Sequence, residues 1–198
     1  MTGSRHGMTA GAASSTFVAW HKCHGPAMPG STAIPAPHAY RCPVRHCQGT
    51  CDMTCLEVGF AMVDAQSSGA PAAMIVEPVQ SSGGVIVPPA TYWEKIQPVL
   101  QKYGILLVAD EVICGFGRTG QMFGSETFGL KPDIMVMSKQ LSSSYLPISA
   151  LMVNERVFEP IADESDRIGV LGHGYTASGH PVAAAVALEN LKIIEERD

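Results

Sequence analysis

Two ionisable residues, Asp110 and Lys139, stand where apolar runs end. Asp110 closes the run ILLVAD, and Lys139 follows DIMVMS. Each run has the composition of a buried strand. Burial disfavours the charged form of each group, so it lowers the pKa of a lysine and raises that of an aspartate. Because a neutral amine is the nucleophile that carbonyl chemistry requires, the pair suits a reaction on an aldehyde or ketone.

An aldehyde cofactor with a basic ring nitrogen would use both groups. The lysine would form an imine with the aldehyde, and the carboxylate would keep the ring nitrogen protonated. This is the arrangement expected for pyridoxal phosphate (PLP), whose protonated ring withdraws electrons from the substrate carbanion. From the two residues alone, the simpler alternatives are an ion pair or two separate surface charges at strand ends.

The elements that must position these residues lie from residue 71 onward. Apolar runs predict strands within 72–79, 105–111, 131–139 and 148–154. Helices are predicted over 90–104, with Pro98 kinking or shortening it, over 154–161 with Asn154 as N-cap, and from Pro181 to the end. The last helix is expected to have its apolar side at Val182, Val186, Leu191 and Ile194.

This alternation indicates an α/β fold with a mainly parallel sheet covered by helices on both faces. Ligands of such sheets bind beyond the carboxyl ends of the strands. Three polar signals stand at predicted strand ends, namely Glu77, Asp110-Glu111 and Ser138-Lys139.

Residues 1–70 are rich in small residues, proline, histidine and cysteine, and only a helix over about 53–66 is predicted there. Four cysteines fall close together with His46, and Cys23 lies further upstream. The four are Cys42, Cys47, Cys51 and Cys55. Their spacing lacks the paired C-x-x-C of common zinc modules, so we assign no metal; the alternatives are a metal or iron–sulfur site and a loop with free thiols.

Composition limits the remaining classes of protein. With 198 residues, 46% hydrophobic, the chain can form one sizeable core. A net charge of -5 gives no basic footprint for nucleic acid. No apolar stretch reaches the roughly 18 residues of a membrane helix, and the N-terminus lacks the apolar core of a secretory signal. The expected compartment is therefore the cytoplasm.

The residues around the pair carry a more specific signal. LLVADEVICGFGRTG, followed after twelve residues by DIMVMSKQLSSS, resembles the signature of class III (subgroup II) aminotransferases, which are PLP enzymes of fold type I. EPVQSSGGVIVPPATYW and GHGYTASGHPVAAAVAL look similar to the ω-amino acid and amine–pyruvate types. The resemblance implies a partial large domain, with residues 1–70 as its loop-rich N-terminal part, residues 71–198 as its PLP-binding core, and no C-terminal small domain.

The resemblance also implies site residues. Lys139 would form the imine and shuttle the proton between Cα and C4′, and Asp110 would pair with the pyridine nitrogen. Val112 would pack on one face of the ring, and His6 of the His-Gly pair would also belong to the cofactor site. Thr176 would donate to the cofactor phosphate of the neighbouring subunit, which implies a homodimer. Glu77 and Gln80 border the site, and we expect supporting roles for them.

The activity implied by the resemblance is transfer of an amino group from an ω-amino acid or amine to pyruvate or another 2-oxo acid. The alternative is a non-catalytic fragment of an aminotransferase that associates with another chain. Three departures from the family bear on the choice. Arg5 replaces a tyrosine that stacks on the cofactor, Gln140 and Ser144 replace glycines after the lysine, and the chain is short, without the upstream loop that cradles the PLP phosphate.

Overall fold

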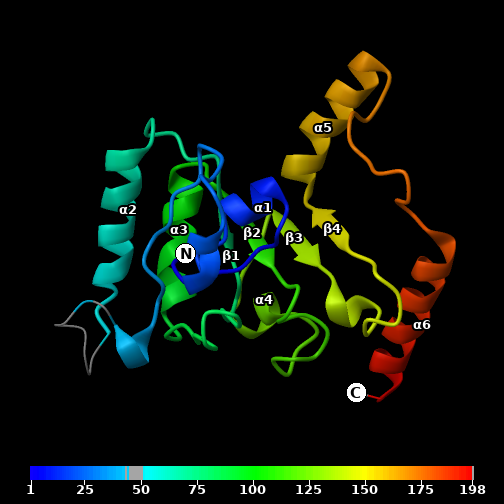
Figure 1. The fold of residues 1–198 in the computed structure, drawn as a ribbon, viewed down its shortest axis with the longest axis horizontal. Helices are drawn as coiled ribbons and strands as arrows, with labels where there is room; N and C mark the ends of the chain where they lie inside the picture. Colours follow the sequence, from blue (N-terminus) through cyan, green and yellow to red (C-terminus); the bar gives the residue numbers. More distant parts are fainter. Residues whose placement is uncertain (43, 45–50, 198) are drawn as a thin grey trace.

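The computed structural model describes residues 1–42, 44 and 51–197. Its centre is a four-stranded sheet in the order β1-β2-β3-β4, shown in Figure 1. The strands are β1 (Ala73–Val76), β2 (Leu106–Asp110), β3 (Ile134–Met137) and β4 (Ala150–Val153). The first three are parallel, and β4 pairs with β3 in the antiparallel sense. The prediction of a mainly parallel sheet is confirmed.

Helices precede, connect and follow the strands. The longer ones are α2 (Thr54–Gln66), α3 (Tyr92–Lys102), α5 (Glu155–Ile168) and α6 (Pro181–Arg197), and the short ones are α1 (Ala10–Ser14) and α4 (Gly124–Thr127). Single 3-10 turns occur at η1 (Ala19–Cys23), η2 (Ala39–Arg41) and η4 (Lys139–Leu141). None of the helices in the described part of the chain combines the length and apolarity that crossing a membrane would require.

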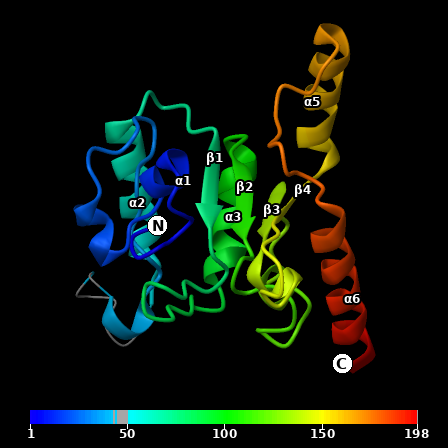
Figure 2. The ribbon, with the colours of Figure 1, turned by 45° about the vertical axis from the view of Figure 1, so that its right-hand side comes forward.

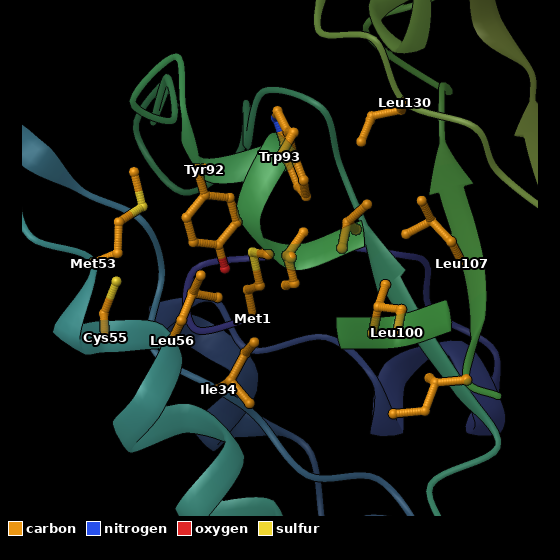
Figure 3. Packing of buried hydrophobic residues seen from close by; sticks show 13 residues of the cluster. Met1, Ile34, Met53, Cys55, Leu56, Tyr92, Trp93, Leu100, Leu107 and Leu130 are labelled. Carbon is orange, nitrogen blue, oxygen red and sulfur yellow. The ribbon is translucent and has the colours of Figure 1, made fainter. Parts of the chain in front are cut away.

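The main core lies where α3 packs between the sheet and α2. Figure 3 shows Tyr92 of α3 next to Leu56 of α2, whereas Trp93 of α3 lies further toward the side where Leu107 of β2 is found. Met1 of the N-terminal segment joins the same cluster, so the cluster draws on the N-terminal segment as well as on α2, α3 and β2. The first seventy residues therefore contribute to the core of the sheet domain.

Side chains alternate between the two faces of the sheet, as the strand repeat requires. On β2, Leu107 and Ala109 are buried, whereas Leu106 and Val108 are half-buried. The buried face continues onto β3 at Met137, which packs with Ala187 of α6. One face is thus covered by helices, and the other is only half-buried in the described chain.

Two predicted helices differ in detail from the structure. The helix predicted over 154–161 begins as expected, since Asn154 Oδ1 accepts a hydrogen bond from Val157 N at 3.2 Å, but α5 continues past Pro160 to Ile168. It ends at Gly169, whose φ of 79° is easily adopted by glycine. Likewise, α3 continues beyond Pro98 to Lys102. Helix-forming residues after each proline offset the single hydrogen bond that the proline removes.

The apolar side predicted for the last helix is partly wrong. Val182 is 56% exposed, whereas Ala183 and Ala187 are buried. Leu191 and Ile194, as predicted, pack against the cluster of Phe116, Met137 and Leu141. Ala183 and Ala187 face inward at the start of α6, and this orientation of the helix leaves Val182 on the outside.

Candidate active site

Asp110 and His6 form a buried pair at the carboxyl end of β2. His6 Nδ1 lies 2.7 Å from Asp110 Oδ2, and the two side chains are 2% and 6% exposed. The other carboxylate oxygen of Asp110 accepts from Val112 N at 3.1 Å. Because a carboxylate only accepts, His6 donates from Nδ1, and the pair fixes the orientation of Asp110. His6 Nε2 is buried with no hydrogen-bond partner among the described residues.

Glu77 holds the segment that carries His6. It follows β1 and is buried, and its Oε1 accepts from Arg5 N at 2.9 Å. Its Oε2 accepts from the backbone and hydroxyl of Ser81 at 3.2 and 3.3 Å. Glu77 therefore aligns the Arg5-His6 peptide with the sheet instead of standing exposed at a strand end. Gln80 supports the same segment, since its Nε2 donates to Thr2 O at 3.0 Å.

Lys139 begins the turn that follows β3, the strand next to β2. Although the residue is exposed, its pKa is lowered from the ordinary lysine value, first by desolvation and next by the charge of Arg5. The carboxylates of Asp110 and Glu77 act in the opposite direction. Lys139 and Asp110 thus lie within electrostatic range of each other, and no ion pair joins them in the part of the chain that the structure describes.

Arg5 stands where the resembling family has a tyrosine, and the charge of its guanidinium lowers the pKa of Lys139. We therefore expect Arg5→Gln to raise the pKa of Lys139, because removing a nearby cation stabilises the ammonium form. Desolvation remains, so the pKa should stay below the ordinary value. Labelling of lysines with trace acetic anhydride across pH, followed by mass spectrometry of the Lys139 peptide, measures this pKa. Arg118→Gln is the comparison. Arg118 lowers the pKa of Lys139 less than Arg5 does, so its replacement should raise that pKa less. An equal or opposite ranking would contradict the assignment.

Three residues of the turn that begins at Lys139 have left-handed backbone. The φ angles are 47° at Lys139, 48° at Ser143 and 62° at Ser144. Ser144 replaces one of the two family glycines and carries the expected strain, on the order of 1–3 kcal/mol. Gln140 replaces the other glycine and has no positive φ, so the expected strain is absent there.

Replacing Ser144 by glycine should therefore stabilise the chain by about 1 kcal/mol, because glycine takes a positive φ without steric cost. The extra freedom of glycine in the unfolded chain offsets part of the gain. Urea unfolding measures the difference. Ser68→Gly, at an exposed loop serine with no positive φ, should give no gain. Equal effects of the two substitutions would refute the strain at Ser144.

Glu111, next to Asp110, has a structural role that the sequence analysis did not assign. It is fully buried, and its two carboxylate oxygens accept from Gly124 N at 3.0 Å and from Ser125 N and Oγ at 2.6 Å each. It thereby joins the end of β2 to the start of α4. An acidic residue directly after a buried strand was the only signal, and it does not distinguish this role from a catalytic one.

The two other predicted cofactor residues are placed less directly. Val112 is half-buried, and its backbone N–H donates to Asp110 Oδ1. Thr176 lies in the exposed segment between α5 and α6, which the structure does not bring to the Asp110–His6 pair by any hydrogen bond among the described residues. Packing of Val112 on a ring and donation by Thr176 across subunits both remain predictions.

The cysteine cluster is only partly described, because His46 and Cys47 lie outside the described residues. Cys42 and Cys55 are buried and Cys51 is half-buried. Within residues 1–42, 44 and 51–197 there is no group of three or more side chains that could hold a metal ion.

Solved structures of transaminases share this fold. An ω-transaminase from Pseudomonas jessenii in complex with PMP superimposes with a TM-score of 0.91 at 53% identity, covering 99% of this chain and 44% of that one. A structure described as a transaminase with L-ala gives a TM-score of 0.90 at 53% identity, covering 100% of this chain and 47% of that one. The fold is that of a PLP-dependent transferase of fold type I.

Sequence comparison gives the family. The model of the family described as aminotransferase class-III matches residues 1–198. Gamma aminobutyrate transaminase 3, chloroplastic, of Solanum lycopersicum is 57% identical over 127 residues, which are 64% of this chain and 24% of that protein. Vanillin aminotransferase of Capsicum chinense is 55% identical over 127 residues, 64% of this chain and 28% of that protein. The chain belongs to the class III aminotransferases, which depend on PLP, and it spans about a quarter of the length of these curated relatives.

Proposed function

We propose that the chain supplies the PLP-binding core of a transaminase that moves an amino group from an ω-amino acid or amine to pyruvate or another 2-oxo acid. The observation that carries the proposal is the buried Asp110–His6 pair at the end of β2, with the Lys139 amine at the end of the adjacent strand and its pKa lowered. The class III relatives include enzymes named for gamma aminobutyrate, an ω-amino acid, which supports the choice of donor.

The residues present fit PLP in two respects. Asp110 is a buried carboxylate whose partners are an imidazole and one backbone N–H, so it can also accept from a protonated ring nitrogen. Lys139 has a lowered pKa, which raises the neutral fraction of the amine. When bound, PLP supplies a ring that stabilises negative charge on the substrate carbon.

The protein groups then have separate tasks. Asp110 holds the proton on the ring nitrogen, and His6 keeps the Asp110 carboxylate in place. Lys139 attaches the cofactor through its Nζ and moves a proton at the substrate carbon, as a general base and acid. Assembly as a homodimer, with Thr176 serving the neighbouring subunit, belongs to the same proposal.

The direct test adds PLP to the purified chain and records the visible spectrum. An absorption band that disappears on borohydride reduction, with the mass of the reduced cofactor on the Lys139 peptide, would support the proposal. Lys131, an exposed lysine before β3, is the internal control and should remain unmodified. A chain that stays colourless with excess PLP would contradict cofactor binding by this polypeptide.

The second candidate is a non-catalytic fragment that associates with another chain. It is favoured by large apolar side chains left exposed from β4 through α5. Leu151, Met152 and Phe158 are exposed by 63%, 58% and 53%, respectively. A colourless chain that elutes as an assembly in size-exclusion chromatography with light scattering would support this candidate, whereas a coloured chain active with pyruvate would exclude it.

A further inference from the structure

Asn190 of α6 is bonded to the turn that begins at Lys139. Its Nδ2 donates to Gln140 O at 2.6 Å and to Leu141 O at 3.3 Å. Its Oδ1 accepts from Ser143 Oγ at 2.7 Å. One side chain thus contacts three of the four residues that follow the lysine, although about fifty positions separate it from them along the chain.

The turn depends on external support. Its left-handed residues, Lys139, Ser143 and Ser144, take a conformation that persists only where the surroundings enforce it. The two backbone hydrogen bonds to Lys139 O, from Ser142 N and Ser144 N, are both 3.2 Å long, and the turn is closed at its far end by Ser142 Oγ, which donates to Leu146 O at 2.6 Å. Ser138 Oγ, which donates to Ile148 O at 3.0 Å, holds the turn only at its start.

Attachment of α6 does not explain the asparagine. Figures 1 and 2 show α6 beside the β3–β4 side of the sheet, and apolar contacts of Ala187, Leu191 and Ile194 hold it there. Among the described residues, the hydrogen bonds of the Asn190 side chain all end on residues 140–143. An apolar residue at this position would keep the helix packed and leave the turn without these bonds.

We propose that Asn190 is a positioning residue that fixes the strained turn after β3 and so holds the Lys139 amine in place for its reaction. The inference rests on the proposed function, in which Lys139 attaches the cofactor. Asn190 acts through the backbone at Gln140 and Leu141, and it contributes no group to the chemistry.

The test compares Asn190→Ala with Lys192→Ala, a change on the same helix at an exposed residue that pairs only with Glu189 among the described residues. Two readouts follow Lys139 in the intact chain: the rate of borohydride-trapped attachment of PLP, and labelling by trace acetic anhydride across pH. We expect Asn190→Ala to slow trapping about tenfold, as the loss of its three hydrogen bonds to the turn allows, and to shift the pKa of Lys139 toward the ordinary value. Lys192→Ala should change neither.

A second substitution separates positioning from general loosening. Ser144→Gly removes strain from the turn, so adding it to Asn190→Ala should restore most of the trapping rate. If Asn190→Ala unfolds the chain, Asn190→Asp serves instead, since it keeps the acceptor for Ser143 and removes the donor to Gln140 and Leu141.

The outcomes separate the two proposals. Absence of trapping at Lys139 in the parent chain would refute cofactor binding, and the labelling profile would still decide the role of Asn190. Equal labelling and trapping in Asn190→Ala and Lys192→Ala would overturn the positioning role. Loss of trapping that Ser144→Gly fails to restore, with every lysine of the chain equally exposed to the reagent, would also overturn it, because the asparagine would then support the fold as a whole.

Discussion

The Lys139→Ala variant should transfer amino groups at least about 10³-fold more slowly than the parent chain, because it loses both the nucleophile and the proton carrier. The fold should survive, since Lys139 is exposed and forms no ion pair among the described residues. Alanine also tolerates the left-handed backbone at this position no worse than lysine. The measurement is steady-state transfer from an ω-amino acid to pyruvate, with urea unfolding as the check on stability.

Lys131→Ala is the matched control, because it removes one exposed lysine at the start of the segment that leads into β3. Its rate should equal that of the parent chain. A Lys139→Ala variant with substantial turnover would show that another group is the nucleophile. Added methylamine offers a further check, since a free amine should restore part of the rate only if the missing group is an amine.

The Asp110→Asn variant should bind PLP more weakly and abstract the substrate proton more slowly, by on the order of 100-fold or more. The amide can still accept from His6 Nδ1 and Val112 N, so the geometry of the strand end is kept while the charge is lost. A neutral partner no longer keeps the ring nitrogen protonated, and an unprotonated ring withdraws electrons less effectively. Single-turnover spectroscopy and PLP titration measure the two effects separately.

Asp163→Asn, at an exposed residue of α5, is the control for removal of one negative charge. It should leave both the affinity for PLP and the single-turnover rate unchanged. An Asp110→Asn chain with the parent rate would mean that Asp110 does not contact the cofactor ring, and its buried bond to His6 would then be purely structural.

Local sequence patterns predicted the strands of the sheet well. The apolar runs before Asp110 and Lys139 are parallel neighbours, β2 and β3, so both residues follow strands at the same edge. The N-cap at Asn154 and the glycine stop after α3 are also visible in the sequence, because they depend on residues within one helical turn.

Features that depend on distant residues could not be predicted in this way. The contact of Asn190 with Gln140, the bond of Glu77 to Arg5 and the outward rotation of Val182 all follow from how separate segments pack. The helix predicted over 154–161 continues past Pro160 to Ile168, because helix-forming residues follow the proline. The antiparallel direction of β4 likewise depends on the path of the connection from β3.

The bond between His6 and Asp110 joins residues 104 positions apart. Closing so large a loop is entropically costly and comes late unless intervening contacts have already formed. Refolding experiments should therefore show the sheet assembling before the chain acquires any capacity to take up vitamin B6. The rate at which the visible absorption of bound PLP appears would then report when the N-terminal segment that carries His6 docks on the sheet.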